Sequence, residues 1–136
     1  MELLELYQLA DAEHIPVYSF DLPQTHSLSL MNNDGSCAVA IDPFGLNSTK
    51  DEKIRLAHEL GHCVTGSFYN RYSDFDIKAK SEYRADKWAI KKLIPKDELQ
   101  AAFEQGYTEP WDLAEYFNVT EEFIIKAVNL YQLGNI

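Results

Sequence analysis

His58-Glu59-Leu60-Gly61-His62 is the stretch around which the rest of this sequence is organised, and it lies inside an apolar-periodic run from Ile54 to Val64. That run predicts an α-helix, on which residues four apart share one face, so the imidazoles of His58 and His62 can point at a single ion. Glu59 is one residue around the helix and is near enough to reach a water molecule bound to that ion. This H-E-x-x-H arrangement, with two metal ligands and a carboxylate general base, is typical of zinc peptidases.

Composition limits the class of protein. The 136 residues, of which 46% are hydrophobic, suffice for a single globular domain with its own core. A formal net charge of −10 argues against direct binding of nucleic acid, because phosphate contacts depend on clustered Lys and Arg, but it suits a basic protein partner. The N-terminus is not typical of a signal peptide, and no stretch approaches the ~18 apolar residues of a membrane span. We therefore expect a cytoplasmic protein that does not bind membranes.

The two cysteines, Cys37 and Cys63, are too few and too isolated to predict a disulfide framework, which fits a reducing compartment. Cys63 follows His62 directly and so faces another side of the helix from the two imidazoles. We interpret Cys63 as a buried structural thiol in preference to a metal ligand.

The remaining periodicity predicts an α+β domain in which a sheet of two or three strands packs on the helix of the H-E-x-x-H motif. Strands are expected at 17–20, 27–30 and 37–41, the last two forming a hairpin around a turn at 32–35. Helices are expected at 2–13, 48–66, 77–93, 96–103, 110–116 and 120–131. We expect one domain over residues 1–136, with a catalytic core at 1–108 and a C-terminal helical pair at 109–136 packed on it.

A catalytic zinc site normally has three protein ligands and one open position for water, so a third ligand has to be found. No histidine follows His62, which leaves a carboxylate, a cysteine or an earlier histidine. Glu82 is the natural candidate, because it lies on the next predicted helix, which the intervening loop can fold back against the first. Asp86 is one turn further along the same face, where it can accept a hydrogen bond from a ligating histidine and fix its tautomer. Without the upstream motif, both acids would be interpreted as ordinary surface residues.

The motif at 58–62, followed by Glu82-x-x-x-Asp86, resembles the HExxH and ExxxD spacing of the gluzincins. The longer pattern E-x-x-A-D-x-W-A at 82–89, followed by Leu93-Ile94-Pro95, is more closely similar to the ImmA/IrrE family of metallopeptidases. The resemblance is good over roughly residues 36–95. It implies a small zincin-like fold, with His58, His62 and Glu82 as the ligands of one Zn²⁺ per chain, Glu59 as the catalytic base, and Asp86 as a residue that orients a ligand.

The resemblance also implies a function: a small cytoplasmic zinc-dependent endopeptidase of the short type often encoded on phages and mobile elements. Such proteins cleave or otherwise inactivate a cognate helix-turn-helix transcriptional repressor and so relieve repression. The rival interpretation is a non-catalytic anti-repressor that holds its target without cutting it, and a third is an ordinary α+β domain with a fortuitous motif. Glu59 favours the enzyme, because a structural metal site has no use for a base beside its ligands.

Two features of substrate handling are also open to prediction. We expect the hairpin edge formed by Cys37, Ala38, Val39, Ala40 and Ile41 to hold an extended peptide by strand addition. A developing oxyanion needs a nearby hydrogen-bond donor, for which Tyr69, Tyr72 and Tyr83 are candidates, although packing is the commoner role for a tyrosine.

Overall fold

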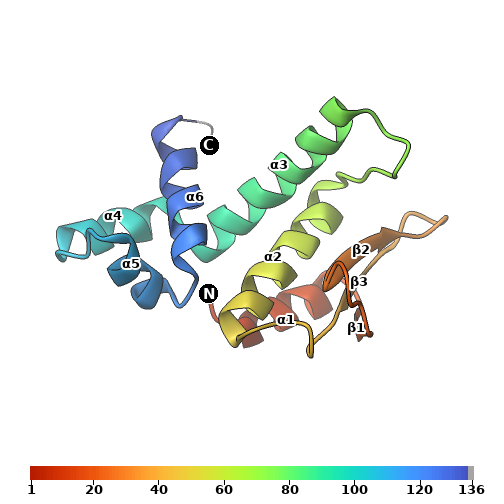
Figure 1. Ribbon diagram of the computed structural model, residues 1–136, viewed down its shortest axis with the longest axis horizontal. Helices are drawn as coiled ribbons and strands as arrows, with labels where there is room; N and C mark the ends of the chain where they lie inside the picture. The colour runs from red at the N-terminus through yellow and green to blue at the C-terminus, as the bar shows by residue number, and fades with distance from the viewer. Residues whose placement is uncertain (135–136) are drawn as a thin grey trace.

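The computed structural model describes residues 1–134, and over this range the chain forms six helices and a three-stranded sheet, confirming the α+β class. The elements in chain order are α1 (Leu3–Ala12), β1 (Val17–Ser19), β2 (Ser27–Met31), β3 (Cys37–Ile41), α2 (Thr49–Thr65), α3 (Phe75–Leu93), α4 (Lys96–Glu104), α5 (Pro110–Phe117) and α6 (Glu121–Gln132). The sheet lies at one end of an elongated molecule and α4, α5 and α6 at the other, with α2 and α3 side by side between them (Figure 1). Residues 135–136 of the predicted C-terminal pair lie outside the described residues.

The sheet has the strand order β1-β3-β2. β2 and β3 form the predicted antiparallel hairpin, from the pair Ser27–Ile41 to the pair Met31–Cys37, whereas β1 pairs with β3 in parallel. The expectation that β3 is an edge strand is therefore wrong. β3 is paired with β2 along its whole length and with β1 from Val39 to Ile41, so that stretch of the strand has no free edge to which a peptide strand could be added. The free edges within the described residues belong to β1 and β2.

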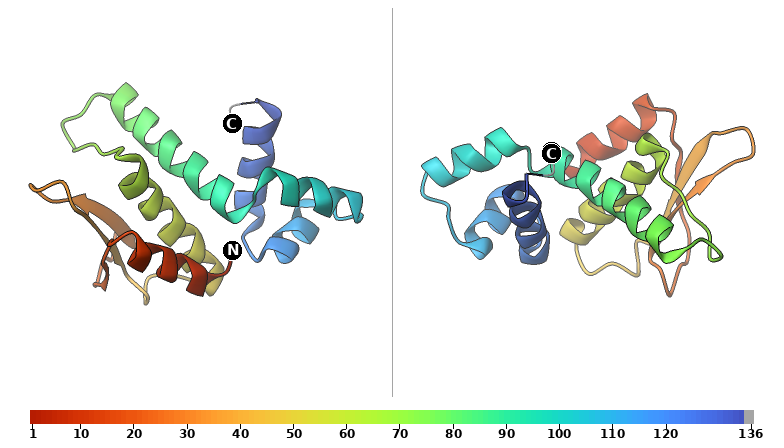
Figure 2. Two further views of the ribbon diagram at one scale, coloured as in Figure 1. Left: turned by 180° about the vertical axis from the view of Figure 1, so that it is seen from behind. Right: turned by 90° about the horizontal axis from the view of Figure 1, so that it is seen from above.

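α2 is the element that positions everything else, since it lies between α1 and α3 (Figures 1 and 2) and packs on β2 and β3. It begins where the sequence predicts, with the Ser48 hydroxyl accepting a hydrogen bond from the Asp51 N–H at 3.3 Å, and ends at Gly66 with a left-handed φ of 66°. At Gly61 a Cβ atom would lie only 2.6 Å from the carbonyl oxygen of Ala85 on α3. The glycine inside the motif therefore allows the backbones of α2 and α3 to meet.

Cys37 and Cys63 form a disulfide that joins β3 to α2, with 5.7 Å between their Cα atoms. The expectation of free thiols is therefore wrong. α2 packs on one face of the sheet, and the disulfide shows that Cys37 points toward this helix and Cys63 toward the sheet. The two residues are 26 positions apart and no local pattern connects them, so the pairing becomes visible only once the strand and the helix are packed.

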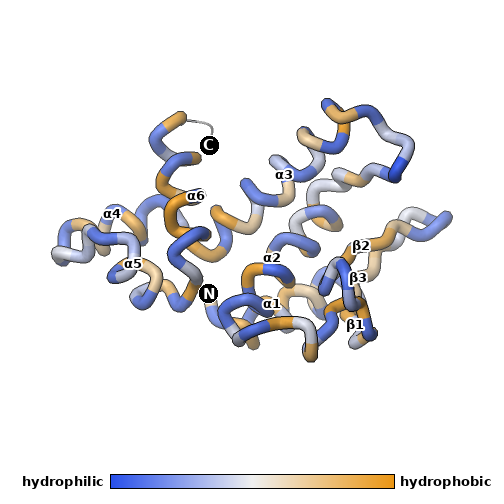
Figure 3. Tube along the Cα trace, in the orientation of Figure 1, coloured by the Kyte–Doolittle hydropathy of each residue, from blue (hydrophilic) through white to orange (hydrophobic). Residues whose placement is uncertain are grey.

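The C-terminal helices are tied to α2 by a buried lysine. Lys53 is 1% exposed, and its ammonium donates to the carbonyl oxygens of Phe117, at 2.9 Å, and Asn118, at 3.3 Å, at the end of α5. Burial lowers the pKa of Lys53, but the carbonyls at a helix C-terminus favour a cation there. Apolar and polar residues alternate along α4, α5 and α6 (Figure 3), and their buried apolar side chains belong to the same core as those of α2. Within residues 1–134, no helix is long and apolar enough to cross a membrane.

Candidate metal centre

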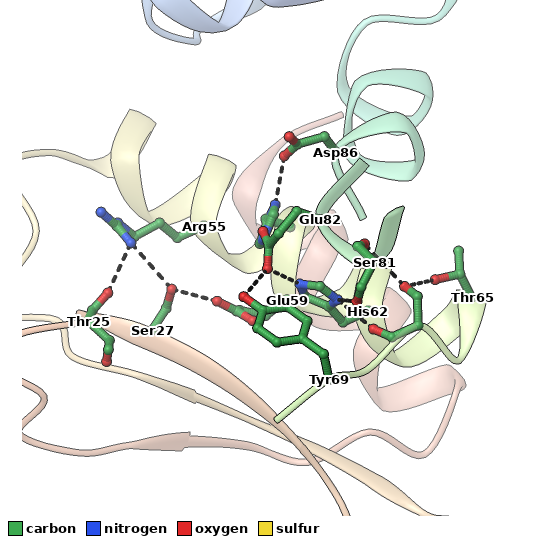
Figure 4. Close-up of polar contacts among 12 residues, drawn as sticks. Thr25, Ser27, Arg55, Glu59, His62, Thr65, Tyr69, Ser81, Glu82 and Asp86 are labelled. Atoms are coloured by element: carbon green, nitrogen blue, oxygen red, sulfur yellow. Dashed lines mark hydrogen bonds and ion pairs between the residues drawn. The ribbon is translucent and has the colours of Figure 1, made fainter. Parts of the chain in front are cut away.

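The three residues predicted to bind metal converge on one point. His58 and His62 lie on successive turns of α2. Glu82, on α3, faces His62 (Figure 4) and also contacts His58. Nε2 of His58 is 2.8 Å from Oε2 of Glu82, and Nε2 of His62 is 3.2 Å from Oε1 of the same carboxylate. One donor atom from each residue falls within 4.8 Å of the others. The close approach at Gly61 makes this possible, because it brings α3 near enough for Glu82 to reach both imidazoles.

The other ring nitrogen of each histidine is held by an acceptor. Nδ1 of His58 lies 2.8 Å from Oδ1 of Asp86, and Nδ1 of His62 lies 2.6 Å from the carbonyl oxygen of Ser67. A carboxylate and a carbonyl can only accept, so both Nδ1 atoms carry hydrogen and both Nε2 atoms face Glu82. Asp86 stands where the sequence predicted, whereas Ser67 was not predicted. The signal for Ser67 was Gly66, whose left-handed conformation turns the chain back over the end of α2.

Electrostatic interactions in the cluster shift the pKa values of Glu82, His58 and Asp86 so as to favour their charged forms. Hydrogen bonds from His58 and His62 hold the pKa of Glu82 well below its usual range. Burial lowers the pKa of His58, but hydrogen bonds to Asp86 and Glu82 outweigh it and raise the pKa to about 9. Burial likewise raises the pKa of Asp86, and its contacts with His58 and with Lys126, whose Nζ is 3.0 Å from Oδ2, lower it to a greater extent. The protons and charges of this cluster therefore occupy the place that a cation would take.

Two imidazole nitrogens and one carboxylate oxygen form a donor set used by catalytic zinc sites, and the same set accepts several other divalent ions. The donor atoms here are preoriented by Asp86 and the Ser67 carbonyl and converge on one point. The residues present therefore fit a divalent metal ion held by His58, His62 and Glu82.

Glu59, the predicted base, is buried on α2 beside these ligands and is held from the sheet. The Ser27 hydroxyl on β2 donates to Oε2 of Glu59 at 2.8 Å. Arg55 in turn donates to the Thr25 carbonyl oxygen at 3.1 Å and lies 3.5 Å from the Ser27 hydroxyl oxygen (Figure 4). Sequence reasoning missed Ser27 and Arg55, because the alternation of serine and leucine at 27–30 does not say which of the two faces meets α2.

A cleft of about 1010 Å³ opens over the site. Its lining comes from five parts of the chain: residues 25 and 27–29 at the edge strand β2, residue 47 and one face of α2, Phe68 and Tyr69 of the loop after α2, Glu82 and Asp86 of α3, and residues 120–123 and 126 at α6. The Tyr69 hydroxyl donates to Oε1 of Glu82 at 2.7 Å, and this bond, together with burial, raises the pKa of Tyr69 to about 12. Neither Tyr72 nor Tyr83 lines the cleft, and no residue of β3 does.

Comparison with known proteins adds one finding to this geometry. The model of the Peptidase_M78 family, described as an IrrE N-terminal-like domain, matches residues 11–129. The match extends well beyond the segment around the motif and includes the ligands, Glu59, the sheet and most of the C-terminal helices. No curated protein matches the chain.

Proposed function

This chain belongs to the Peptidase_M78 family of IrrE N-terminal-like domains, a metallopeptidase family, and from that premise we propose that it is a zinc-dependent endopeptidase that cleaves a helix-turn-helix transcriptional repressor. The observation that carries the proposal is the convergence of His58, His62 and Glu82 within 4.8 Å, next to the buried carboxylate of Glu59. Cleavage of the repressor would switch on the genes that it silences, as on a phage or another mobile element.

The chain's own groups divide the chemistry among themselves. His58, His62 and Glu82 would hold the metal, which when bound supplies an acidified water molecule and polarises the scissile carbonyl. Glu59 takes the proton of the attacking water and passes it to the leaving amine. Because Ser27 occupies Oε2 of Glu59, Oε1 is the oxygen left free to accept that proton. Asp86 and the Ser67 carbonyl hold the two imidazoles in the tautomer that presents Nε2.

Substrate binding is proposed at β2, in place of the central strand β3. The outer edge of β2 is unpaired within the described residues, and residues 27–29 of this strand line the cleft beside the ligands. An extended segment of the substrate can pair with that edge through main-chain hydrogen bonds, which require no particular side chains. This mode of binding suits cleavage within a chain and hence an endopeptidase.

The proposed partner is a basic protein and not the nucleic acid that such a protein binds. A net charge of −10 attracts a DNA-binding repressor and repels DNA itself. The cytoplasm is where such a repressor acts and is the proposed location. Because a disulfide is uncommon in a reducing cytoplasm, trapping the thiols of Cys37 and Cys63 in intact cells would show which redox state the protein has there.

A variant with glutamine at the base tests the proposal. Glu59→Gln keeps the size of the side chain and an oxygen that can accept from Ser27, so the fold and the metal affinity are expected to stay unchanged. Co-expressed with a candidate helix-turn-helix repressor and a reporter that it silences, wild type is expected to cleave the repressor and relieve repression, and Glu59→Gln to do neither. Relief of repression by Glu59→Gln without cleavage would instead establish the non-catalytic anti-repressor.

A further inference from the structure

We propose that Tyr69 is a catalytic residue, whose hydroxyl donates a hydrogen bond to the oxyanion that forms on the scissile carbonyl. The inference rests on the proposed peptidase function and assigns a group to a step for which the sequence left three tyrosines open. Three observations support it: the Tyr69 hydroxyl lies at the ligands, three neighbouring side-chain donors already have acceptors, and Tyr72 and Tyr83 lie outside the cleft.

The Tyr69 hydroxyl lies at the ligands themselves. It is 2.7 Å from Oε1 of Glu82, the same oxygen that is 3.2 Å from Nε2 of His62 (Figure 4). The ring approaches from the loop between α2 and α3, lines the cleft and is 42% exposed. The hydroxyl therefore reaches the ligands from the cleft, so that an oxyanion formed beside the ligands would lie near this donor.

Three other side-chain donors near the ligands already have acceptors. The Ser27 hydroxyl donates to Glu59, Arg55 donates to the Thr25 carbonyl, and Lys126 donates to Asp86. Tyr69 also has an acceptor, but that acceptor is a carboxylate oxygen in the ligand set. If Glu82 held a metal ion, its carboxylate would be a poorer acceptor, and an oxyanion next to it would compete for the phenolic proton. A half-exposed side chain on a loop can make the small rotation that this exchange of acceptors requires.

The other two tyrosines are excluded by position and become controls. Tyr72 is 79% exposed, and its hydroxyl accepts from the neighbouring Arg71. Tyr83 follows Glu82 on α3, and neither tyrosine lines the cleft. Each presents a phenol close to the site in sequence but away from the reacting atoms.

Tyr69 has a competing role, which is only to orient Glu82 as a ligand. The two roles differ in what the hydroxyl does for metal binding. A residue that merely orients Glu82 supports zinc affinity, whereas an oxyanion donor supports binding of a tetrahedral anion and leaves zinc affinity nearly unchanged.

The test is Tyr69→Phe, with Tyr72→Phe and Tyr83→Phe as matched controls. Zinc affinity is measured by competition with a chromogenic chelator. The zinc-dependent affinity for N-phosphoryl-Leu-Phe amide, whose phosphoryl oxygens mimic the oxyanion, is measured by calorimetry. We expect Tyr69→Phe to bind zinc within about threefold of wild type but the phosphoryl probe about tenfold or more weakly, and its kcat on the repressor to fall about 100-fold with little change in KM. The controls should match wild type.

Weakened zinc binding, with unchanged probe affinity at saturating zinc, would overturn the proposal in favour of an orienting role. Unchanged affinities for both zinc and probe would also overturn it, as would a zinc-loaded wild type without zinc-dependent affinity for the probe. Tyr69→Leu is a second variant with the same expected results should the phenylalanine variant fold poorly. None of these binding measurements depends on the repressor, so failure of the proposed function, shown by the behaviour of Glu59→Gln, is distinguishable from failure of this inference.

Discussion

At the scale of single residues, the hydrogen bond from Ser27 fixes the orientation of Glu59, the proposed base. Glu59 is buried, and the interaction that fixes its carboxylate comes from β2, the strand proposed to bind substrate. In Ser27→Ala the carboxylate loses this donor and is free to rotate. Because small errors in the placement of a catalytic group are costly, kcat is expected to fall about tenfold or more, with little change in zinc affinity. Steady-state kinetics on the repressor check this, and Ser27→Thr, which retains a hydroxyl, should recover most of the rate. Equal losses in the two variants would indicate a packing defect.

Asp86 and Lys126 lie one behind the other next to His58, and we expect their effects on zinc affinity to differ in size. Asp86 contacts the imidazole directly at 2.8 Å, whereas Lys126 reaches only Asp86 and its side chain is 54% exposed. Removing a carboxylate that orients a ligating histidine typically lowers metal affinity about 10- to 100-fold, so we expect a loss of this size for Asp86→Ala. Lys126→Met should change zinc affinity far less, because a solvent-exposed ion pair is worth about 0–1 kcal/mol. Chelator competition measures both, and equal losses would contradict this ordering.

At the scale of elements, the packing of α2 on α3 brings Glu82 to the two histidines, and Gly61 is the residue that permits this packing. Alanine at 61 would gain about 1 kcal/mol of helix propensity, but its Cβ would lie 2.6 Å from the Ala85 carbonyl oxygen, a backbone atom that cannot rotate away. Overpacking of this kind costs about 1–3 kcal/mol, so the steric effect dominates. Gly61→Ala is expected to unfold at lower urea concentration and, because α3 carries Glu82, to bind zinc more weakly.

Gly35→Ala is the control for this prediction. Gly35 has a φ of 88°, and a Cβ there would meet nothing within 4 Å. The substitution strains the hairpin turn and lowers stability, but it lies away from α3 and should leave zinc affinity unchanged. Loss of stability without loss of zinc affinity in Gly61→Ala would show that Glu82 does not depend on this helix contact.

Local rules account for the elements of this fold better than for their pairing. The geometry of a helix places His58 and His62 on one face, and Ser48 and Gly66 predict both ends of α2. The choice of β3 as the central strand could not be predicted, because it depends on β3 pairing in parallel with β1, the strand that precedes the hairpin. The disulfide and the Ser27–Glu59 bond depend on the same packing of sheet on helix, so local patterns at Cys37 or Ser27 carried no signal for them.

Lys53 connects the two ends of the molecule. Through this buried cation, α2, the helix of the candidate metal centre, holds the C-terminus of α5. In Lys53→Met the side chain keeps a similar length and loses the ammonium, so the carbonyl oxygens of Phe117 and Asn118 are left without that donor. A buried acceptor left unpaired costs about 1–3 kcal/mol, and the free energy of unfolding in urea should fall by that amount. Lys126→Met, which removes a half-exposed ammonium, is the control and should change it little. An undiminished free energy of unfolding in Lys53→Met would mean that this tie does not stabilise the C-terminal helices.

At the scale of the whole molecule, we propose that the fold has one purpose, which is to hold a divalent ion between α2 and α3 at the floor of the cleft. Anomalous X-ray scattering at the zinc edge, from crystals grown with zinc, tests that claim most directly. We predict one strong peak per chain, at about 2.0–2.2 Å from Nε2 of His58, Nε2 of His62 and a carboxylate oxygen of Glu82. No peak at this position, or a peak whose ligands exclude Glu82, would contradict it.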